Sequence, residues 1–183
     1  IYAANEVSHA LAERMDGLVL PGGPLGAALE VGCSIGVFTA LLAPRCRSLT
    51  ALDVSEVALA AARRRCAGSG VRFLRADVPA QWPAGRFDLI VLSELLYFLE
   101  PDEIPALAAR VGGSLAPGGT VLLVDYLGPC DRPLDGAAAA DAFITAVQPL
   151  GLSPAGRGGS SDYRIDRLAR AASSAATGPA GTA

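Results

Sequence analysis

Residues 28–39 read Ala-Leu-Glu-Val-Gly-Cys-Ser-Ile-Gly-Val-Phe-Thr, and this stretch decides the fold of the chain. The apolar run over residues 28–31 predicts a buried strand, a turn of small residues follows it, and a helix begins directly after the turn. Glu30 lies near the end of the strand, and a second carboxylate, Asp53, ends the next apolar run. The two carboxylates therefore flank a glycine turn in one βαβ unit.

The glycine turn favours one kind of ligand over another. Gly32 and Gly36 allow the backbone to approach a ligand and a helix to pack closely on the strand. The dinucleotide pattern G-x-G-x-x-G needs glycines where this chain has Ser34 and Val37. Glu30 would repel a phosphate and favours a positive group instead. A nucleoside with a cationic tail, such as S-adenosylmethionine (SAM), fits this pattern; the alternative is an ordinary strand–helix turn.

Two further aspartates follow predicted strands. Asp53 ends a strand next to the first one, where a carboxylate accepts from both ribose hydroxyls; the alternative is that it only caps the following helix. Asp77 comes directly after the third strand and can accept from an adenine amino group, while the Val78 backbone contacts a ring nitrogen. The alternative for Asp77 is a turn aspartate in front of a proline.

The continuous apolar run over residues 87–92 predicts a strand that is buried on both faces. Ser93 and Glu94 at its carboxyl end can meet the sulfur and the methionine portion of the cofactor, and Tyr97 can line the side of the methyl acceptor. The alternative for Tyr97 and the neighbouring Phe98 is core packing.

Strands and helices alternate along the chain, which predicts an α/β fold with a mostly parallel central sheet. Asp88, at the start of its strand, lies at the end of the sheet away from the ligand and has a structural role. We expect one domain over residues 1–170, followed by a disordered tail over residues 171–183 that contains only small residues and proline. Strands are expected at residues 26–31, 49–54, 71–76, 87–92, 120–126 and 163–170, the last as a closing antiparallel edge strand. Helices are expected at residues 3–20, 38–42, 56–67, 102–115 and 138–148.

Composition excludes several classes of function. The net charge is −3 and every basic residue except one histidine is arginine, so lysine Schiff-base and P-loop chemistry are excluded and no attraction to nucleic acid is expected. Four cysteines without CxxC spacing and a single histidine predict no metal site and indicate reduced thiols in a cytoplasmic protein. Charged residues interrupt the N-terminal segment, and there is no 18-residue apolar span, so neither a signal peptide nor a membrane helix is expected.

Five motifs occur in the order found in class I SAM-dependent methyltransferases, and the chain resembles that superfamily over about residues 25–127. The combination of Gly-Cys-Ser-Ile-Gly (residues 32–36) with Ser-Glu-Leu-Leu-Tyr-Phe-Leu (residues 93–99) resembles the nodulation N-methyltransferase (NodS-like) branch. Members of that branch methylate amines on sugars, and relatives occur beside natural-product pathways. The five motifs are Glu30-Val-Gly-Cys-Ser-Ile-Gly36, Leu52-Asp-Val-Ser55, Arg75-Ala-Asp-Val78, Phe87-Asp-Leu-Ile-Val-Leu-Ser-Glu94 and Leu115-Ala-Pro-Gly-Gly-Thr120.

The resemblance implies a Rossmann-like class I methyltransferase fold that uses SAM and releases S-adenosylhomocysteine. It implies that the methionine end of the cofactor is held by the glycine loop, ribose and adenine by the ends of the second and third strands, and the sulfur side by the fourth. The cofactor-binding residues expected on this basis are Glu30, Gly32, Cys33, Ser34, Gly36, Asp53, Val54, Asp77, Val78 and Ser93. Ser34 replaces a glycine that is common in the superfamily, and the short N-terminal segment leaves the acceptor pocket undefined.

Methyl transfer from a sulfonium needs alignment and desolvation more than a covalent catalyst. Glu94 can orient an amine, Tyr97 can line its pocket, and His9 either folds over the cleft from the N-terminal helix or is an exposed helix residue. The scarcity of bases favours an amine acceptor over a hydroxyl, so we expect N-methylation of an amino sugar or a natural-product amine.

Other functions remain open or are disfavoured. A small-molecule O-methyltransferase and a non-catalytic SAM-binding module fit the same motifs, whereas the glycine spacing disfavours a nicotinamide oxidoreductase. A nucleic-acid methyltransferase fits poorly, because no Asn/Asp-Pro-Pro-Tyr/Phe tetrad follows the fourth strand. The expected partner is a small methyl acceptor, with no nucleic acid and no membrane, and the chain can be a monomer or a homodimer.

Overall fold

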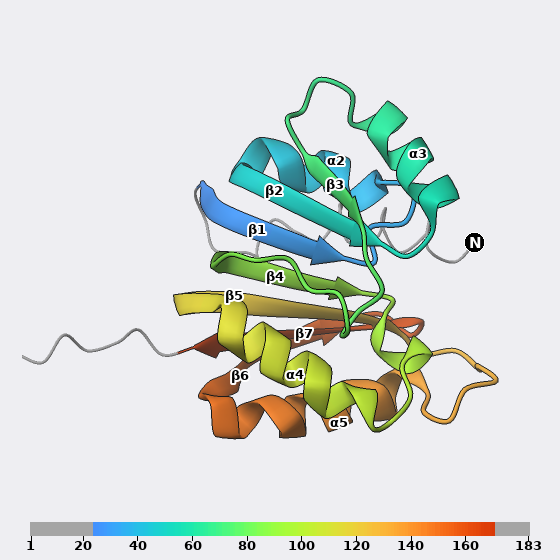
Figure 1. Cartoon of the computed structure of the whole chain (residues 1–183). Helices are drawn as coiled ribbons and strands as arrows, with labels where there is room; N and C mark the ends of the chain where they lie inside the picture. Colours follow the sequence, from blue (N-terminus) through green and yellow to red (C-terminus); the bar gives the residue numbers. More distant parts are fainter. Residues whose placement is uncertain (1–23, 171–183) are drawn as a thin grey trace, which may run out of the picture.

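A computed structural model describes residues 24–170 of the chain. Its centre is a seven-stranded sheet with the order β3-β2-β1-β4-β5-β7-β6 (Figure 1). The first five strands run parallel to one another, and β7 pairs antiparallel with both β5 and β6. The strands are β1 (Leu25–Val31), β2 (Cys46–Asp53), β3 (Arg72–Arg75), β4 (Phe87–Ser93), β5 (Leu115–Tyr126), β6 (Leu152–Gly159) and β7 (Tyr163–Arg170).

Helices cover both faces of this sheet. Two apolar clusters show the layering: one joins the sheet to α4 and α5, and the other joins its opposite face to α2. The helices are α2 (Val37–Leu42), α3 (Glu56–Arg65), α4 (Glu103–Ser114) and α5 (Gly136–Val147). Short 3₁₀ turns are η1 (Ala43–Arg45), η2 (Leu96–Phe98) and η3 (Gln148–Leu150).

Strand β4 shows why the sheet is buried on both faces. Leu89 and Val91 pack in the cluster around α2, whereas Ile90 and Leu92 pack in the cluster around α4 and α5. All four side chains are almost fully buried, because successive residues of a strand point to opposite faces. The continuous apolar run therefore predicted this strand correctly. At its start, the Asp88 carboxylate accepts from the Ala27 N–H at 2.7 Å, which confirms a structural role.

The order of the strands places a switch point between β1 and β4. From β1 the chain moves outward through β2 to β3, and then returns to the other side of β1 with β4. Ligands of open α/β sheets bind beyond the carboxyl ends of the strands at such a point. The carboxyl ends of β1, β2 and β4 lie together, on the right in Figure 1.

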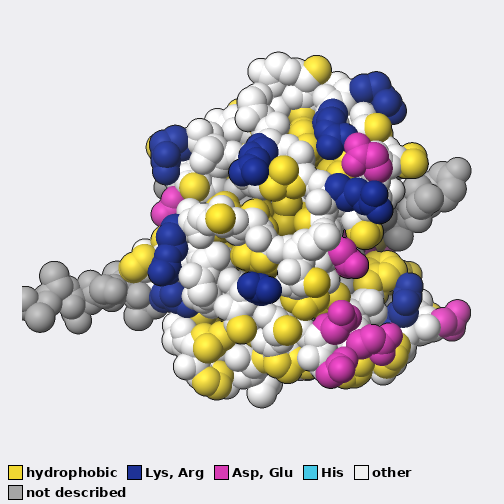
Figure 2. Space-filling model, viewed as in Figure 1, with side chains coloured by type: hydrophobic (Ala, Val, Ile, Leu, Met, Phe, Trp, Pro, Cys, Tyr) yellow, Lys and Arg dark blue, Asp and Glu magenta, His cyan; other side chains and the backbone are white. Residues whose placement is uncertain are grey.

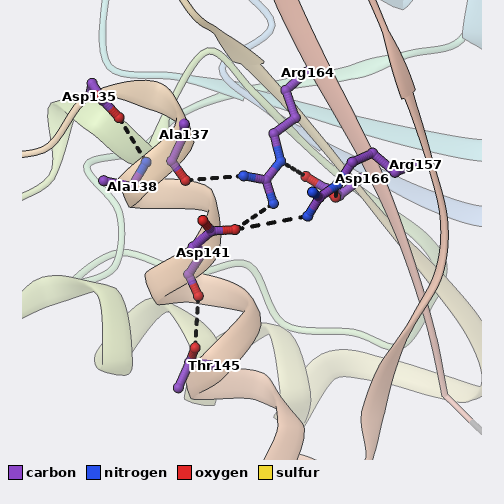
Figure 3. A network of polar contacts seen from close by, with 8 residues as sticks. All are labelled: Asp135, Ala137, Ala138, Asp141, Thr145, Arg157, Arg164 and Asp166. Carbon is purple, nitrogen blue, oxygen red and sulfur yellow. Dashed lines mark hydrogen bonds and ion pairs between the residues drawn. The ribbon is translucent and has the colours of Figure 1, made fainter.

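Two helices begin directly after a residue whose side chain caps them, and the first of these caps was predicted. The Ser55 hydroxyl accepts from the Ala58 N–H at 3.3 Å, which confirms Ser55 as the N-cap of α3. Asp135 caps α5 in the same way, with a bond of 2.8 Å from the Ala138 N–H. Helix α5 is then tied to β7 by Arg164, which lies between Asp166 of its own strand and Asp141 of the helix (Figure 3).

The C-terminal half of the sheet differs from the prediction in two ways. Strand β5 begins at Leu115, directly after α4, although Pro117-Gly-Gly119 suggested a turn there; the pairing with β4 shifts at this point. Strand β7 is antiparallel as predicted, but β6 (Leu152–Gly159) lies outside it and forms the edge. The sequence pattern did not predict β6, because its glycines and proline are disfavoured inside strands and are tolerated at an edge.

Some predictions lie outside the described residues. These are the N-terminal helix over residues 3–20, His9 within it, and the tail over residues 171–183. Between residues 24 and 170, no helix has the length and apolar character needed to cross a membrane.

Candidate functional site

A cavity of about 390 Å³ opens at the switch point, beyond the carboxyl ends of β1, β2 and β4. Residues from four predicted motifs, far apart in sequence, meet at its wall. The site residues predicted from sequence that line it are Gly32, Asp53, Val54, Asp77, Val78 and Glu94.

The glycine loop brings β1 close to the end of β4. Gly32 has a φ of +85°, and a Cβ placed there would lie 2.3 Å from the backbone oxygen of Ser93. The N–H groups of Gly32 and Cys33 donate to the Leu52 carbonyl at 3.0 and 2.9 Å, which fastens the loop to β2. A side chain at position 32 would therefore push two strands apart at the edge of the cavity.

Gly36 contributes to packing rather than to the cavity wall. A Cβ at this position would lie 2.9 Å from both the Cα and the Cβ of Ala62, on α3. The prediction that this glycine permits close packing is right, but the close neighbour is a helix, α3, and not the strand.

Asp53 joins the loop to the cavity. One carboxylate oxygen accepts from the Ser34 N–H and the other from the Ser55 N–H, each at 2.8 Å. Each carboxylate oxygen has two acceptor positions, so a second position remains on each for a ligand hydroxyl. Asp53 therefore supports the start of α3, as the alternative reading held, and still faces the cavity.

Glu30 and Cys33 lie behind the loop. Both side chains are buried. Burial, with a smaller contribution from the negative charge of Asp53, raises the pKa of Glu30 to about 7, so a positive group brought near it would favour its ionised form. Burial likewise raises the pKa of Cys33 far above its ordinary value, so this thiol is not a nucleophile at neutral pH.

The adenine side of the predicted site is formed by the turn after β3. Asp77 and Val78 line the cavity, and the peptide bond from Val78 to Pro79 is cis. The Asp77 N–H donates to the side chain of Gln81 at 3.0 Å, and the Gln81 N–H donates back to the Asp77 carbonyl at 2.8 Å. These bonds hold the turn and leave the Asp77 carboxylate available.

Glu94 is the polar group that lines the cavity at the end of β4, whereas Asp77 lines it at the end of β3. It has a φ of +52°, which is unusual for a residue with a side chain. Its Oε2 atom accepts from the Tyr97 hydroxyl. Oε1 is buried and makes no hydrogen bond of ordinary geometry, although the Tyr126 backbone N–H lies close enough to the carboxyl to lower its pKa. Burial raises the pKa of Glu94 above its ordinary value. Tyr97 packs in the main core and does not line the cavity, so the core-packing alternative holds; its hydroxyl is linked to the site through Glu94.

The remaining predicted residues lie next to the cavity and do not line it. Ser93 is buried and contacts the loop through its backbone, while Ser34 reaches the site through its bond to Asp53. One position was missed as a site residue. Phe98 is 54% exposed at the cavity wall, with the Arg132 guanidinium 4.9 Å from its ring centroid. Asp125 ends the apolar run of β5, as Asp53 ends that of β2, but it is fully buried and does not line the cavity.

The part of the chain from residue 24 to 170 contains no group of three or more His, Cys, Asp or Glu side chains that could hold a metal ion. The four cysteines are free thiols. The polar groups at the cavity are therefore carboxylates and backbone atoms. This set suits a ligand with hydroxyl, amino and cationic groups.

Comparisons with known proteins agree with this reading. A family model described as a methyltransferase domain matches residues 28–119. Nodulation protein S of Sinorhizobium fredii (strain NBRC 101917 / NGR234) is 40% identical over 148 residues, which are 79% of this chain and 68% of that protein. Nodulation protein S of Rhizobium tropici is 42% identical over 106 residues, 56% of this chain and 44% of the relative. The chain thus spans about two thirds of the length of the first of these curated relatives and less than half of the length of the second.

A solved structure gives the same answer for the fold. The N-methyltransferase NodS of Bradyrhizobium japonicum WM9, in complex with S-adenosyl-L-homocysteine, superposes with a TM-score of 0.74 at 26% identity. The match covers 90% of this chain and 87% of that one. The mostly parallel sheet with its antiparallel pair is the arrangement expected from the sequence.

Proposed function

The chain belongs to the methyltransferase domain family and uses SAM, and from this premise we propose that it transfers the methyl group to the amine of a small molecule. The observation that carries the proposal is Glu94: a carboxylate at the cavity wall with one oxygen buried and without a hydrogen-bond partner. An amine in the cavity can donate to the Glu94 carboxylate, and its proton can pass to that carboxylate. The N-methyltransferase named among the similar structures supports the same choice.

The residues at the cavity fit the cofactor. Asp53 offers acceptor positions for ribose hydroxyls, and Asp77 with the Val78 backbone offers an acceptor and a donor for adenine. Glu30 would favour the cationic methionine end through its charge. When bound, SAM supplies a methyl group on a sulfonium, in line for a nitrogen lone pair to accept it. S-adenosylhomocysteine is the product that remains.

The protein contributes position, proton acceptance and exclusion of water. Phe98 and Leu95 supply apolar surface at the cavity, and Glu94 holds the acceptor nitrogen by a hydrogen bond. Fixing two reactants in this way can contribute about 7–11 kcal/mol to catalysis, so no covalent intermediate is required. The Tyr97 hydroxyl fixes the Glu94 carboxylate while it does so.

The charge of the surface beside the cavity supports a cationic acceptor. Glu103 lines the cavity, and Glu100 and Asp102 are exposed next to it. Figure 2 shows acidic side chains gathered on this face near the start of α4, with a basic side chain close to them. Such a rim raises the local concentration of a positively charged molecule. We propose an amino sugar, or an amine on a similar polar scaffold, as the acceptor class.

A turnover assay tests this proposal. The full chain is incubated with SAM and pairs of acceptors that differ only in an amine or hydroxyl, such as D-glucosamine and D-glucose, and release of S-adenosylhomocysteine is measured. We expect turnover with amines alone. Glu94→Gln should lower kcat about 10²-fold without changing the Kd for SAM, whereas Asp135→Asn, at the exposed start of α5 and away from the cavity, should retain activity. Turnover with hydroxyls only would identify an O-methyltransferase, and cofactor binding without turnover on a broad panel would indicate a binding module.

A further inference from the structure

Three buried carboxylate oxygens at the ends of β4 and β5 have no hydrogen-bond partner. They are Oε1 of Glu94 and both oxygens of Asp125, whose side chain is 0% exposed. Burial of an unpaired polar atom is unfavourable, and native proteins contain few such atoms. Two of them on one residue, beside a cavity, therefore need a reason.

The two residues are neighbours in the sheet. Ser93 pairs with Val124 in the parallel register of β4 and β5, and the Glu94 N–H donates to the Val124 carbonyl at 2.8 Å. Glu94 and Asp125 each follow directly after this pair. Burial raises the pKa of Tyr97, and its hydrogen bond to Glu94 and the negative charges of Glu94 and Asp125 raise that pKa further. Tyr97 and Asp125 thus lie behind Glu94, which lines the cavity.

Arg164 faces Asp125 across the β5–β7 pair, but it does not neutralise Asp125 by a hydrogen bond. Its guanidinium donates to Asp166 through Nε, to Asp141 through Nη2 at 2.6 Å, and to the Ala137 carbonyl through Nη1 at 3.2 Å (Figure 3). The arginine is held toward α5 by these bonds. Asp125 is left without a partner within the described part of the chain.

We infer that Asp125 is a positioning residue that acts through Glu94, and that together the two carboxyls form a site for an ammonium group of the acceptor. This inference rests on the proposed function. Two carboxylates buried side by side cannot both ionise easily, so the pair retains one proton and one negative charge in the free enzyme. Asp125 thereby strengthens the proton affinity of Glu94, the member that reaches the cavity.

The proton step follows from this arrangement. An acceptor that is an ammonium in water enters with its charge toward the pair, and the proton that the pair held leaves to solvent, because the ammonium now compensates the second negative charge. One N–H bond then breaks, the proton moves to the Glu94 carboxylate beside the ionised Asp125, and the electron pair of that bond stays on nitrogen as the lone pair needed for methyl transfer. The pair goes from two negative charges to one. A hydroxyl acceptor carries no positive charge into the site and gains nothing from it.

The test measures the titration of Glu94 directly. In the full chain labelled with ¹³C at glutamate carboxyls and saturated with S-adenosylhomocysteine, we expect Glu94 to titrate well above an ordinary glutamate. Asp125→Asn should lower its proton affinity by about tenfold or more. Asp135→Asn, which removes a charge from the exposed start of α5 and still caps it, should leave Glu94 unchanged. The other charged or titratable groups facing this pair are Tyr97, Tyr163, Arg164 and Asp166.

Ammonium binding is tested in the same samples with ethylammonium chloride, and ethanol serves as the neutral counterpart. Ethylammonium should shift the Glu94 signal, ethanol should not, and Asp125→Asn should weaken the ethylammonium response about tenfold. An unchanged Glu94 midpoint in Asp125→Asn, or an equal response to both probes, would overturn the inference. If Asp125→Asn does not fold, the reciprocal measurement applies: the Asp125 midpoint, followed with ¹³C-aspartate, must fall in Glu94→Gln.

The outcomes separate the inference from the proposed function. A coupled pair in a protein that methylates no amine would refute the proposed function and leave the coupling in place. Amine turnover in a protein whose Glu94 is not coupled to Asp125 would refute the inference and leave the proposed function in place.

Discussion

The backbone N–H of Ser34 donates a hydrogen bond of 2.8 Å to the Asp53 carboxylate, which joins the glycine loop after β1 to the end of β2. Ser34 has a φ of +48°, an unusual backbone conformation for a serine, and the bond to Asp53 holds it there. The same carboxylate lines the cavity. Asp53 thus shapes the loop and offers acceptor positions to a ligand at once.

Asp53→Ala should weaken binding of SAM strongly. The variant loses charge-assisted hydrogen bonds to ribose, a loss of about 1.5–3 kcal/mol, which is about ten- to a hundredfold in Kd. Isothermal titration calorimetry measures it.

The matched control for this variant is Asp88→Ala. Asp88 also accepts a backbone N–H, that of Ala27, but lies at the far end of the sheet. The Asp88→Ala variant should be less stable than wild type and should bind SAM with unchanged affinity. Equal affinity in wild type and Asp53→Ala would contradict the assignment of Asp53 to ribose.

Gly32→Ala should unfold more readily than Gly68→Ala. Both glycines have positive φ, +85° and +80°, so each alanine suffers backbone strain of about 1–2 kcal/mol. Only at Gly32 would the new Cβ meet an atom, the Ser93 oxygen at 2.3 Å, whereas nothing lies within 4 Å at Gly68. The extra clash should add about 1–3 kcal/mol, seen as a lower midpoint in urea unfolding. Equal midpoints would show that the loop does not need the close approach.

Glu30 should make the protein less stable as the pH rises from about 4.5 to 7. Burial raises its pKa in the folded state to about 7, from an ordinary value of 4.5. Between these values the folded chain binds more protons than the unfolded chain, so the free energy of unfolding falls with increasing pH. Above about pH 7 the penalty is constant, at about 3 kcal/mol.

Glu30→Gln removes this titration. Its stability relative to wild type should increase through the same window and then level off, as measured by urea unfolding at a series of pH values. The difference between the two proteins is the quantity to follow, because other carboxyls titrate in both. A difference that is independent of pH would mean that Glu30 is not held in its protonated form.

Tyr97→Phe should lower kcat while leaving the affinity for SAM unchanged. The substitution removes the hydroxyl that fixes Glu94 and keeps the ring in the core. Loss of a hydrogen bond to a charged group costs about 1.5–3 kcal/mol, or about ten- to a hundredfold in rate if it is used only when the acceptor reacts. Tyr126→Phe, whose ring packs on Tyr163, is the matched control. An unchanged kcat in Tyr97→Phe would remove this residue from the mechanism.

Hydrophobic periodicity and turn residues in the sequence were enough to predict most strands of the sheet. Apolar runs ending in Glu30, Asp53 and Ser93 are strands because central parallel strands are buried on both faces. The same logic failed for residues 152–159, since an edge strand needs no apolar run and this one contains three glycines and a proline. It also failed at Pro117, where the sheet accommodates turn residues through a shift in register.

The site was predictable where the motif itself reaches the cavity, as at Gly32, Asp53 and Asp77. The sequence could not show that Tyr97 bonds to Glu94, because the bond depends on a positive φ at Glu94 and a 3₁₀ turn after β4. Nor could it show that Asp125 is left without a partner. That fact depends on Arg164, on another strand, being held by α5.

The most direct test of the central claim is a calorimetric titration of the full chain with SAM, S-adenosylhomocysteine and NADH. We expect both SAM and S-adenosylhomocysteine to bind at one site in the micromolar range, and NADH not to bind. Binding of NADH at the same site, or binding of neither SAM nor S-adenosylhomocysteine, would contradict this claim.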